Sequence, residues 1–546
     1  MNFIKTLTLI LLVLFMAGCN RSQENSFLDL KQAFIGWFLK SHPIISQDFN
    51  QLDNIEGWRD FSKDGLDEYF ADLQRFFIEL SQIDRSKLSD DLEFEYLVLW
   101  SFLRNTTYYE SRLSPYRFDF TIWSNILQEG LEYINLECGT LTAREEKILK
   151  SRLYGLKHIA QNIESHTDSP LNVFIKDGTE NINIIKKRML TFLNECETDT
   201  NLYSRWNSPI FNSYENLNKI INNIRNQEIF INPNIDKSIW ENGYEIYFGQ
   251  FLEELISEEV LNNEIQKTFS IMLETALPLY LKEYDEPIWV SIQDTLQVLK
   301  TVFKSFDEKN INGIELVNKS KNILNDLEYQ FKNQYFKDLK YPEFNFKVSD
   351  SSLHYKADYI SNFNNGYSAN FYLPKILDST LLINEHLLEY QIINQIFPGK
   401  LTLNIQSSNS SNLLKLLKDN IFLNGWELYI QDILAKSNYF KNKPEVLLLI
   451  LENKLVSMLK LKSQIKMYDD KEYDLESNMV FSEFAKKSLT TYWMRPYPVM
   501  DYLIFKEILE LKKFHFKNDN NNINSFNNLI TLHGPHFIFV RQNLVN

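Results

Sequence analysis

Hydrophobic residues recur along most of this chain at the spacing of one face of an α-helix. Apolar positions follow one another at intervals of three and four over long stretches, and only 15 glycines and 14 prolines occur in 546 residues. This pattern is typical of amphipathic helices, which many glycines or prolines would interrupt. We therefore expect a mainly α fold. The clearest predicted helices cover residues 66–83, 92–113, 143–163, 245–284, 316–336, 444–467 and 499–514.

Between residues 344 and 373 the helical spacing gives way to alternation. Alternating apolar and polar residues are typical of short strands that bury one face. The best candidates are 344–348 and 368–372. The sequence therefore predicts a small sheet within a large helical body, with a soft boundary between a helical region at 27–340 and a second region at 341–546.

The first twenty residues combine a basic start, a short apolar run and a cysteine. Lys5 precedes an apolar run at 7–15, and two small residues stand before Cys19. The run is too short to span a bilayer, and this arrangement suits cleavage and lipidation of the cysteine. It predicts a lipoprotein signal peptide at 1–18, a lipid anchor on Cys19 and a polar tether at 19–26. An ordinary secretory signal and an uncleaved anchor helix are the alternatives, and all three place the body outside the cytoplasm.

Acidic residues outnumber basic ones, and the formal net charge is −15. Nucleic-acid binding requires a basic surface for the phosphates, so a nucleic-acid partner is excluded. The charge also gives no attraction to anionic lipid, so membrane contact depends on Cys19. Hydrophobic residues make up 44% of the chain, which is sufficient for a large buried core.

Two cysteines remain besides Cys19. Cys138 and Cys196 could pair in an oxidising compartment, but nothing in the sequence brings them together. Two buried thiols are the favoured interpretation, and a disulfide is the alternative. Neither cysteine has a CxxC partner or clustered histidines, so no structural zinc site or redox motif is predicted.

Two motifs in the second half of the chain have the layout of a metal site whose ligands are replaced. They are NQIFPGK at residues 394–400 and NGWELY at residues 424–429. They resemble His-Glu-x-x-Pro-Gly-His and Glu-Gly-Trp-Ala-x-Tyr, the motifs of the bacterial domain-of-unknown-function family eight-eight-five, which resembles zinc peptidases. Weaker matches occur in order along nearly the whole mature chain, at residues 42–43, 57–62, 83–89, 367–374 and 496–505.

The resemblance assigns the chemical roles of the family to four positions that carry other residues here. The two zinc-binding histidines would stand at Asn394 and Lys400, the zinc-binding glutamate at Asn424 and the water-activating glutamate at Gln395. Zinc is held by imidazole, thiolate or carboxylate. An amide cannot accept the proton of water near neutral pH, and a lysine ammonium has no lone pair and repels a dication. We therefore expect no catalytic residue, no metal and no cofactor.

The scaffold positions of the motifs are retained. The resemblance implies a helical metallopeptidase-like body with the small sheet beside a central cleft. Tyr502 and Arg495 are the candidate binding residues of that cleft, and a core tyrosine and a surface arginine are the alternatives. The expected function is that of an inactive, lipid-anchored protein of the bacterial envelope, on the periplasmic or outer-membrane side, which binds a peptide or protein. The unchanged residues are Pro398, Gly399, Gly425, Trp426 and Tyr429.

Two other functions remain open. His386 and Glu389 share one predicted helix face, and together with Glu427 they could form the relocated metal site of an active hydrolase. An ordinary helix-surface pair is the simpler interpretation of these residues. The other function is a purely structural envelope lipoprotein whose groove is filled by side chains. The histidines at 533 and 536 flank a Gly-Pro turn signal, and neither a Gly-x-Ser-x-Gly motif nor a phosphate loop occurs.

Overall fold

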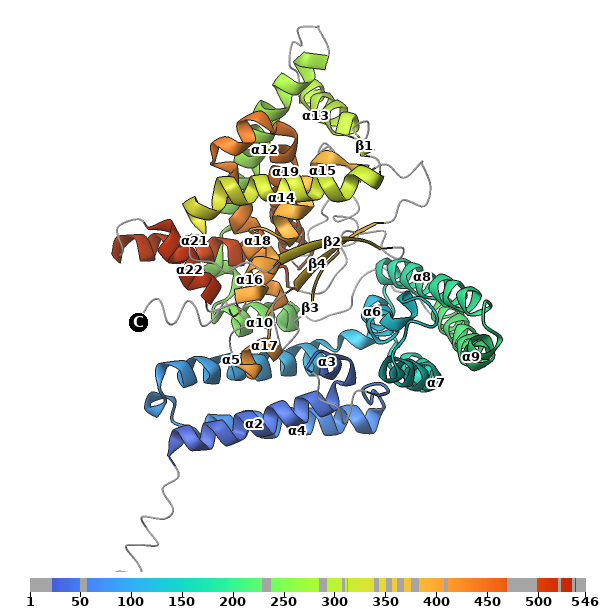
Figure 1. The fold of residues 1–546 in the computed structure, drawn as a ribbon. Helices are drawn as coiled ribbons and strands as arrows, with labels where there is room; N and C mark the ends of the chain where they lie inside the picture. The colour runs from blue at the N-terminus through green and yellow to red at the C-terminus, as the bar shows by residue number, and fades with distance from the viewer. Residues whose placement is uncertain are drawn as a thin grey trace, which may run out of the picture. The chain divides into compact units, whose positions relative to one another are not determined.

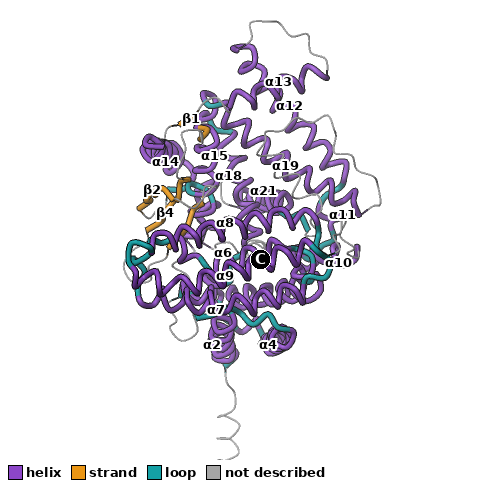
Figure 2. Tube along the Cα trace, turned by 90° about the vertical axis from the view of Figure 1, so that its right-hand side faces the viewer, coloured by secondary structure: helices purple, strands orange, loops and turns teal. Residues whose placement is uncertain are grey.

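The computed structural model has the predicted mainly α fold. Figure 2 shows helix along most of the trace, with strands in a few short stretches. The chain forms two compact units, one from the residues up to Arg112 with Ser411–Leu417, the other from the remaining residues. The boundary expected near residue 340 falls inside the second unit. The structure describes residues 22–49, 56–227, 237–283, 292–306, 310–311, 313–337, 343–349, 356–360, 368–374, 383–406, 411–468, 498–518, 522–532 and 536.

The first unit is helical and holds an aromatic core. Phe34 meets the ring of Phe76 edge to face at 5.4 Å, and Trp37 stacks on Tyr69 at 5.1 Å. Arg59 lies 3.9 Å from the centre of the Tyr69 ring, which adds a cation–π contact to this packing. The helices of the unit are α2 (Gln23–Ser41), α3 (Pro43–Asp48), α4 (Lys63–Ser81), α5 (Asp90–Thr107) and α17 (Asn412–Leu416), with the 3-10 turn η1 (Arg85–Lys87) and the π-helical end η2 (Tyr108–Leu113).

The start of α2 corrects the predicted tether. The helix begins at Gln23, where the Ser22 hydroxyl accepts a hydrogen bond from the backbone N–H of Asn25 at 3.1 Å. A serine in this position satisfies one of the N–H groups that a helix start leaves unpaired, and residues 23–26 of the predicted tether are helical. The predicted signal peptide and Cys19 lie outside the described residues. Within the described ranges, no helix combines the length and apolarity needed to cross a bilayer.

A four-helix part opens the second unit. In it, α6 packs on α8, and both α7 and α8 pack on α9. The helix predicted at 143–163 is confirmed as α7, which starts with a capping box formed by Thr142 and Glu145. The members are α6 (Phe120–Gly130), α7 (Ala143–His166), α8 (Asn172–Cys196) and α9 (Thr200–Arg225), with the 3-10 turns η3 (Pro115–Arg117) and η4 (Glu132–Asn135).

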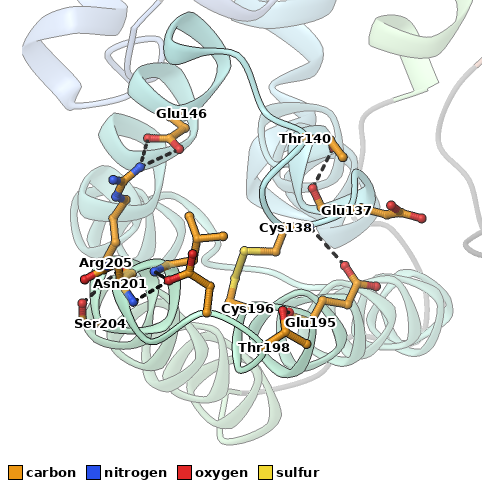
Figure 3. The surroundings of a disulfide bond; sticks show 12 residues. Glu137, Cys138, Thr140, Glu146, Glu195, Cys196, Thr198, Asn201, Ser204 and Arg205 are labelled. Atoms are coloured by element: carbon orange, nitrogen blue, oxygen red, sulfur yellow. Dashed lines mark hydrogen bonds and ion pairs between the residues drawn. A yellow bond between two sulfur atoms is a disulfide. The ribbon is translucent and has the colours of Figure 1, made fainter.

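Cys138 and Cys196 form a disulfide, so the favoured interpretation of two free thiols is wrong. Their Cα atoms are 5.3 Å apart although 58 positions separate them in sequence. Figure 3 shows the bond joining the loop before α7 to the last residue of α8, where the Glu195 carboxylate also accepts a hydrogen bond from the backbone N–H of Cys138 at 3.2 Å. The packing of α8 places the two cysteines together, and local sequence carries no sign of it.

The larger core of the second unit extends from Trp240 to Ile530. Here α12 packs along α19, and α18 packs along α21. The helices are α10 (Lys237–Phe248), α11 (Leu252–Leu255), α12 (Glu258–Glu283), α13 (Ile292–Phe306), α14 (Gly313–Tyr335), α15 (Glu385–Gln395), α16 (Lys400–Gln406), α18 (Asn420–Ala435), η6 (Asn438–Asn442), α19 (Pro444–Tyr468), α21 (Asp501–Asn518) and α22 (Ile523–Leu532).

The single helix predicted at 245–284 is three helices in the structure. The chain leaves α10 at Gly249, whose φ of +70° lies in the left-handed region that favours glycine and ends helices. It then forms the short α11 before α12 begins. The apolar spacing continues across this break, which is why the pattern did not reveal it.

The small sheet is confirmed. Figure 1 shows its three strands side by side in the order β2, β4, β3, with β2 parallel and β3 antiparallel to β4. Phe346 and Phe371 lie opposite each other and their ring centres are 5.7 Å apart. Two further short strands, β1 and β5, pair antiparallel. The strands are β1 (Asn310–Ile311), β2 (Glu343–Ser349), β3 (Lys356–Ile360), β4 (Ser368–Pro374) and β5 (Ile383–Asn384).

Candidate functional site

A tight turn between α15 and α16 places the first motif. The Phe397–Pro398 peptide bond is cis, and Gly399 passes very close to the end of α15. A Cβ atom on Gly399 would lie 1.9 Å from the carbonyl oxygen of Asn394, so any side chain at this position would displace the turn. Pro398 and Gly399 therefore hold Lys400, the first residue of α16, close to the end of α15.

The retained residues of the second motif fix α18 in the core. A Cβ atom on Gly425 would lie 2.3 Å from Cγ2 of Ile504, so the glycine lets α18 and α21 approach closely. The indole N–H of Trp426 donates to the carbonyl oxygen of Pro398 at 3.1 Å, which joins the two motifs. The Tyr429 hydroxyl donates to Asn527 Oδ1 at 2.8 Å. These residues are explained by packing, whatever the chemistry of the site.

Lys400 points at the second motif. Its ammonium group donates to Asn424 Oδ1 at 2.9 Å and forms an ion pair with Glu427 Oε2 at 3.1 Å. The side chains of Lys400 and Glu427 are 26% and 13% exposed, so the pair is largely removed from solvent without being sealed. Asn424 in turn donates through Nδ2 to Asp501 Oδ1 at 3.1 Å. A positive charge therefore lies beside Asn424, one of the positions that the resemblance assigns to zinc ligands.

Asn394 reaches the same face of α18 one turn further on. It is buried, and its Oδ1 accepts a hydrogen bond from Gln431 Nε2 at 2.8 Å. Gln431 accepts another from Asn453 Nδ2 at 3.2 Å. The Tyr390 hydroxyl belongs to this buried group, and burial raises its pKa well above the ordinary value, with the nearby Glu427 carboxylate adding to the shift.

Three of the four replaced positions therefore meet along one side of α18. Asn424, Glu427 and Gln431 succeed one another at helical spacing and contact Lys400 or Asn394. Gln395 is half-buried and makes no hydrogen bond or ion pair with the described residues.

Sequence reasoning missed most partners of this network. The sequence suggested Glu427 only as a ligand of a relocated metal. Its position three residues after Asn424 indicates that the two side chains share a helix face. Gln431, Asn453 and Asp501 gave no signal. Asp501, for example, meets Asn424 from 77 positions away.

The residues proposed for a relocated metal site do not converge. Glu389 accepts hydrogen bonds from Lys443 at 2.8 Å and from the Tyr439 hydroxyl, whereas Glu427 pairs with Lys400. His386 lies beside the ring of Phe306. Among the described residues, no three histidine, cysteine, aspartate or glutamate side chains are grouped so that they could hold a metal ion.

Tyr502 lies in the core of the second unit. It has no exposed surface, and its ring is 5.7 Å from that of Phe505. Its hydroxyl has no hydrogen-bond partner among the described residues, and burial raises its pKa above the ordinary value. The binding role of Tyr502 stays a prediction. Arg495 lies outside the described residues, as does the 533–536 turn except for the buried His536.

Two solved structures resemble this chain over nearly their whole length. One is a candidate lipoprotein of unknown function from Shewanella oneidensis, with a TM-score of 0.68 and 13% identity over 95% of this chain and 100% of its own. The other is a candidate lipoprotein from Colwellia psychrerythraea, with a TM-score of 0.71 and 13% identity over 96% of this chain and 99% of its own. At such identity the likeness shows a shared fold alone.

No protein-family model matches the chain, and neither does any curated protein. The resemblance to family eight-eight-five therefore depends on the motifs. The two structural neighbours are consistent with a lipoprotein and do not bear on a peptidase.

Proposed function

We propose that this chain is a lipid-anchored protein of the bacterial envelope, a divergent relative of family eight-eight-five that binds a peptide or protein without hydrolysing it. One observation supports the proposed absence of hydrolysis. The Lys400 ammonium group is held by Asn424 at 2.9 Å and by Glu427 at 3.1 Å, where the resemblance would require a zinc ion and its ligands. A fixed ammonium repels a dication and cannot activate water.

Other features support the rest of the proposal. The hydrogen bond from Trp426 to Pro398 supports the motif alignment, because it joins residues that the alignment retains in both motifs. The fold shared with two candidate lipoproteins supports the anchor expected on Cys19. The partial exposure of Lys400 and Glu427 favours ligand binding over the purely structural function, because a filled groove would cover both side chains.

Rebuilding the metal site tests whether the two motifs form a former zinc site. We expect the native full chain to hold no tightly bound zinc and to cleave no peptide. A variant with Asn394→His, Gln395→Glu, Lys400→His and Asn424→Glu restores three ligands and the base, and we expect about one zinc per chain by elemental analysis. The matched control carries the same changes but keeps Lys400, and we expect no zinc. Zinc with peptide cleavage in the native chain, or an empty rebuilt variant, would overturn the proposal.

Partner binding is tested in cells with a photo-crosslinking amino acid. Position 395 is suitable, because Gln395 is half-buried and makes no polar contact with the part of the chain that the structure describes. Position 329 is the control, because Tyr329 is 81% exposed on α14. We expect a discrete crosslinked product from position 395 alone. Equal labelling at both positions would contradict binding at this site.

The anchor is tested separately. We expect radiolabelled fatty acid to be incorporated into the native chain and not into Cys19→Ser, with the variant moving from the membrane fraction to the soluble envelope fraction. Labelling of the variant would show that the lipid is attached elsewhere or that the cysteine has no such role.

A further inference from the structure

The start of α12, together with α10, α11 and one residue of α19, borders a half-open cavity of about 600 Å³. This volume lies within the range of small-molecule sites. None of the residues that line it belongs to the network around Lys400. The cavity therefore requires its own explanation.

Its inner wall is apolar and fixed. Trp240 is 2% exposed, and its indole N–H donates to Gln464 Oε1 at 3.0 Å. Leu252 and Ile256 are buried beside it in the lining, and Ile465 of α19 completes this wall. An apolar stem of a ligand would gain free energy here by leaving water.

An aromatic ring stands at the lining with much of its surface uncovered. Phe251 is 49% exposed, although the next residue, Leu252, is buried. Its position is held, because its backbone N–H donates to the Glu254 carboxylate at 3.2 Å. An exposed aromatic face attracts an organic cation.

The polar part of the lining is strongly acidic. Four glutamates line the cavity and Lys237 is the one basic residue among the lining residues. Glu241 is 3.6 Å from Lys237, and Glu258 is 3.9 Å from Lys466, so both are only loosely paired. Glu253 is exposed and makes no hydrogen bond or ion pair with the described residues. An acidic rim beside an apolar wall is complementary to a cation carried on an apolar stem.

We propose that this cavity binds an organic cation, an ammonium or guanidinium group on an apolar stem. The stem occupies the wall formed by Trp240 and Ile256, and the charge lies among Glu241, Glu253 and the ring of Phe251. Such a group can come from a free aliphatic amine or from a lysine or arginine side chain of a peptide. The chemistry of recognition is the same for both sources.

Isothermal titration of the full chain in lipid nanodiscs tests this with probes that share a six-carbon stem. We expect hexan-1-amine, as its ammonium ion, to bind saturably at one site, with hexan-1-ol and hexanoate clearly weaker, and binding to weaken with salt. A short lysine-containing peptide forms the second arm. Tighter binding of either cation identifies its source, and both results support the site. Absence of binding by both cations up to about 10 mM, or equal binding of hexan-1-ol, would overturn the proposal.

Variants locate the binding. Glu241→Gln with Glu253→Gln should weaken hexan-1-amine binding about three- to tenfold, in line with two partly exposed charge contacts. Phe251→Ala should weaken it about two- to fivefold through the lost cation–π contact. The matched controls are Glu259→Gln, an exposed glutamate of α12 outside the lining, and Tyr329→Ala, an exposed aromatic on α14. Equal loss in the controls, or no loss in the cavity variants, would refute the assignment.

Discussion

The ion pair between Lys400 and Glu427 allows a quantitative test of the candidate site. At the observed 3.1 Å, Coulomb's law gives about 1.3 kcal/mol at the dielectric constant of water and about 5 kcal/mol at an effective value of 20. The pair is 26% and 13% exposed, so its environment lies between these cases. Loss of hydration and the ordering of two side chains oppose the attraction, and we expect a net coupling of about 1–2 kcal/mol.

A double-mutant cycle measures this coupling. The free energy of unfolding in urea is compared for the native chain, Lys400→Met, Glu427→Gln and the double variant. The matched control is the pair Lys513–Glu510 on α21, which is separated by 2.6 Å but is 67% and 57% exposed. We expect its coupling to be below about 0.5 kcal/mol.

The difference between the two coupling energies tests whether Lys400 is held in place. If the Lys400–Glu427 coupling is no larger than that of Lys513–Glu510, the ammonium is not held between its partners as the structure indicates. Lys400 would then not be fixed where its charge repels a metal ion.

Three further predictions concern stability. Gly425→Ala should lower the free energy of unfolding by about 1–3 kcal/mol, because the added Cβ overlaps α21. Gly36→Ala should raise it by up to about 1 kcal/mol, because its Cβ meets nothing within 4 Å and alanine favours the helix. Equal effects of the two substitutions in urea denaturation would contradict this. Burial raises the pKa of Asp419 from 3.8 to about 6, so its stabilising contribution is complete below pH 4 and is lost as the pH rises through 6. A series of denaturation curves between pH 4 and 7 should show this decline in the native chain and not in Asp419→Asn, and a parallel decline in both would rule it out. Replacing Cys138 and Cys196 by serine should cost about 2–4 kcal/mol, given their separation of 58 residues, and an unchanged thermal midpoint would show that the bond contributes nothing.

The helices illustrate how far local pattern extends. The segment predicted at 143–163 is α7, because its apolar face and its capping box lie within a few residues of each other. The prediction of one helix at 245–284 was wrong, because a left-handed turn at Gly249 ends the helix without interrupting the apolar spacing. The spacing of apolar residues indicates which side of the chain is buried. It does not indicate whether that side belongs to one helix or to several.

In the candidate site, too, the sequence predicted some residues and not their partners. The motifs alone grouped Asn394, Lys400 and Asn424, and the structure brings Asn394 and Lys400 against the side of α18 that carries Asn424. Their partners could not be predicted, because Gln431 and Asp501 arrive from 37 and 77 positions away through the packing of α15, α18 and α21.

The sequence by itself determined the mainly α fold and the strands β2 and β4 of the small sheet, since residue type and local spacing carry that information. Only the tertiary structure decided that Cys138 and Cys196 pair, that Lys400 is neutralised by Glu427, and that a glutamate-lined cavity lies beside Trp240. These features depend on which helix faces meet. That choice is made by burial and close packing over the whole chain, and no short stretch of sequence contains it.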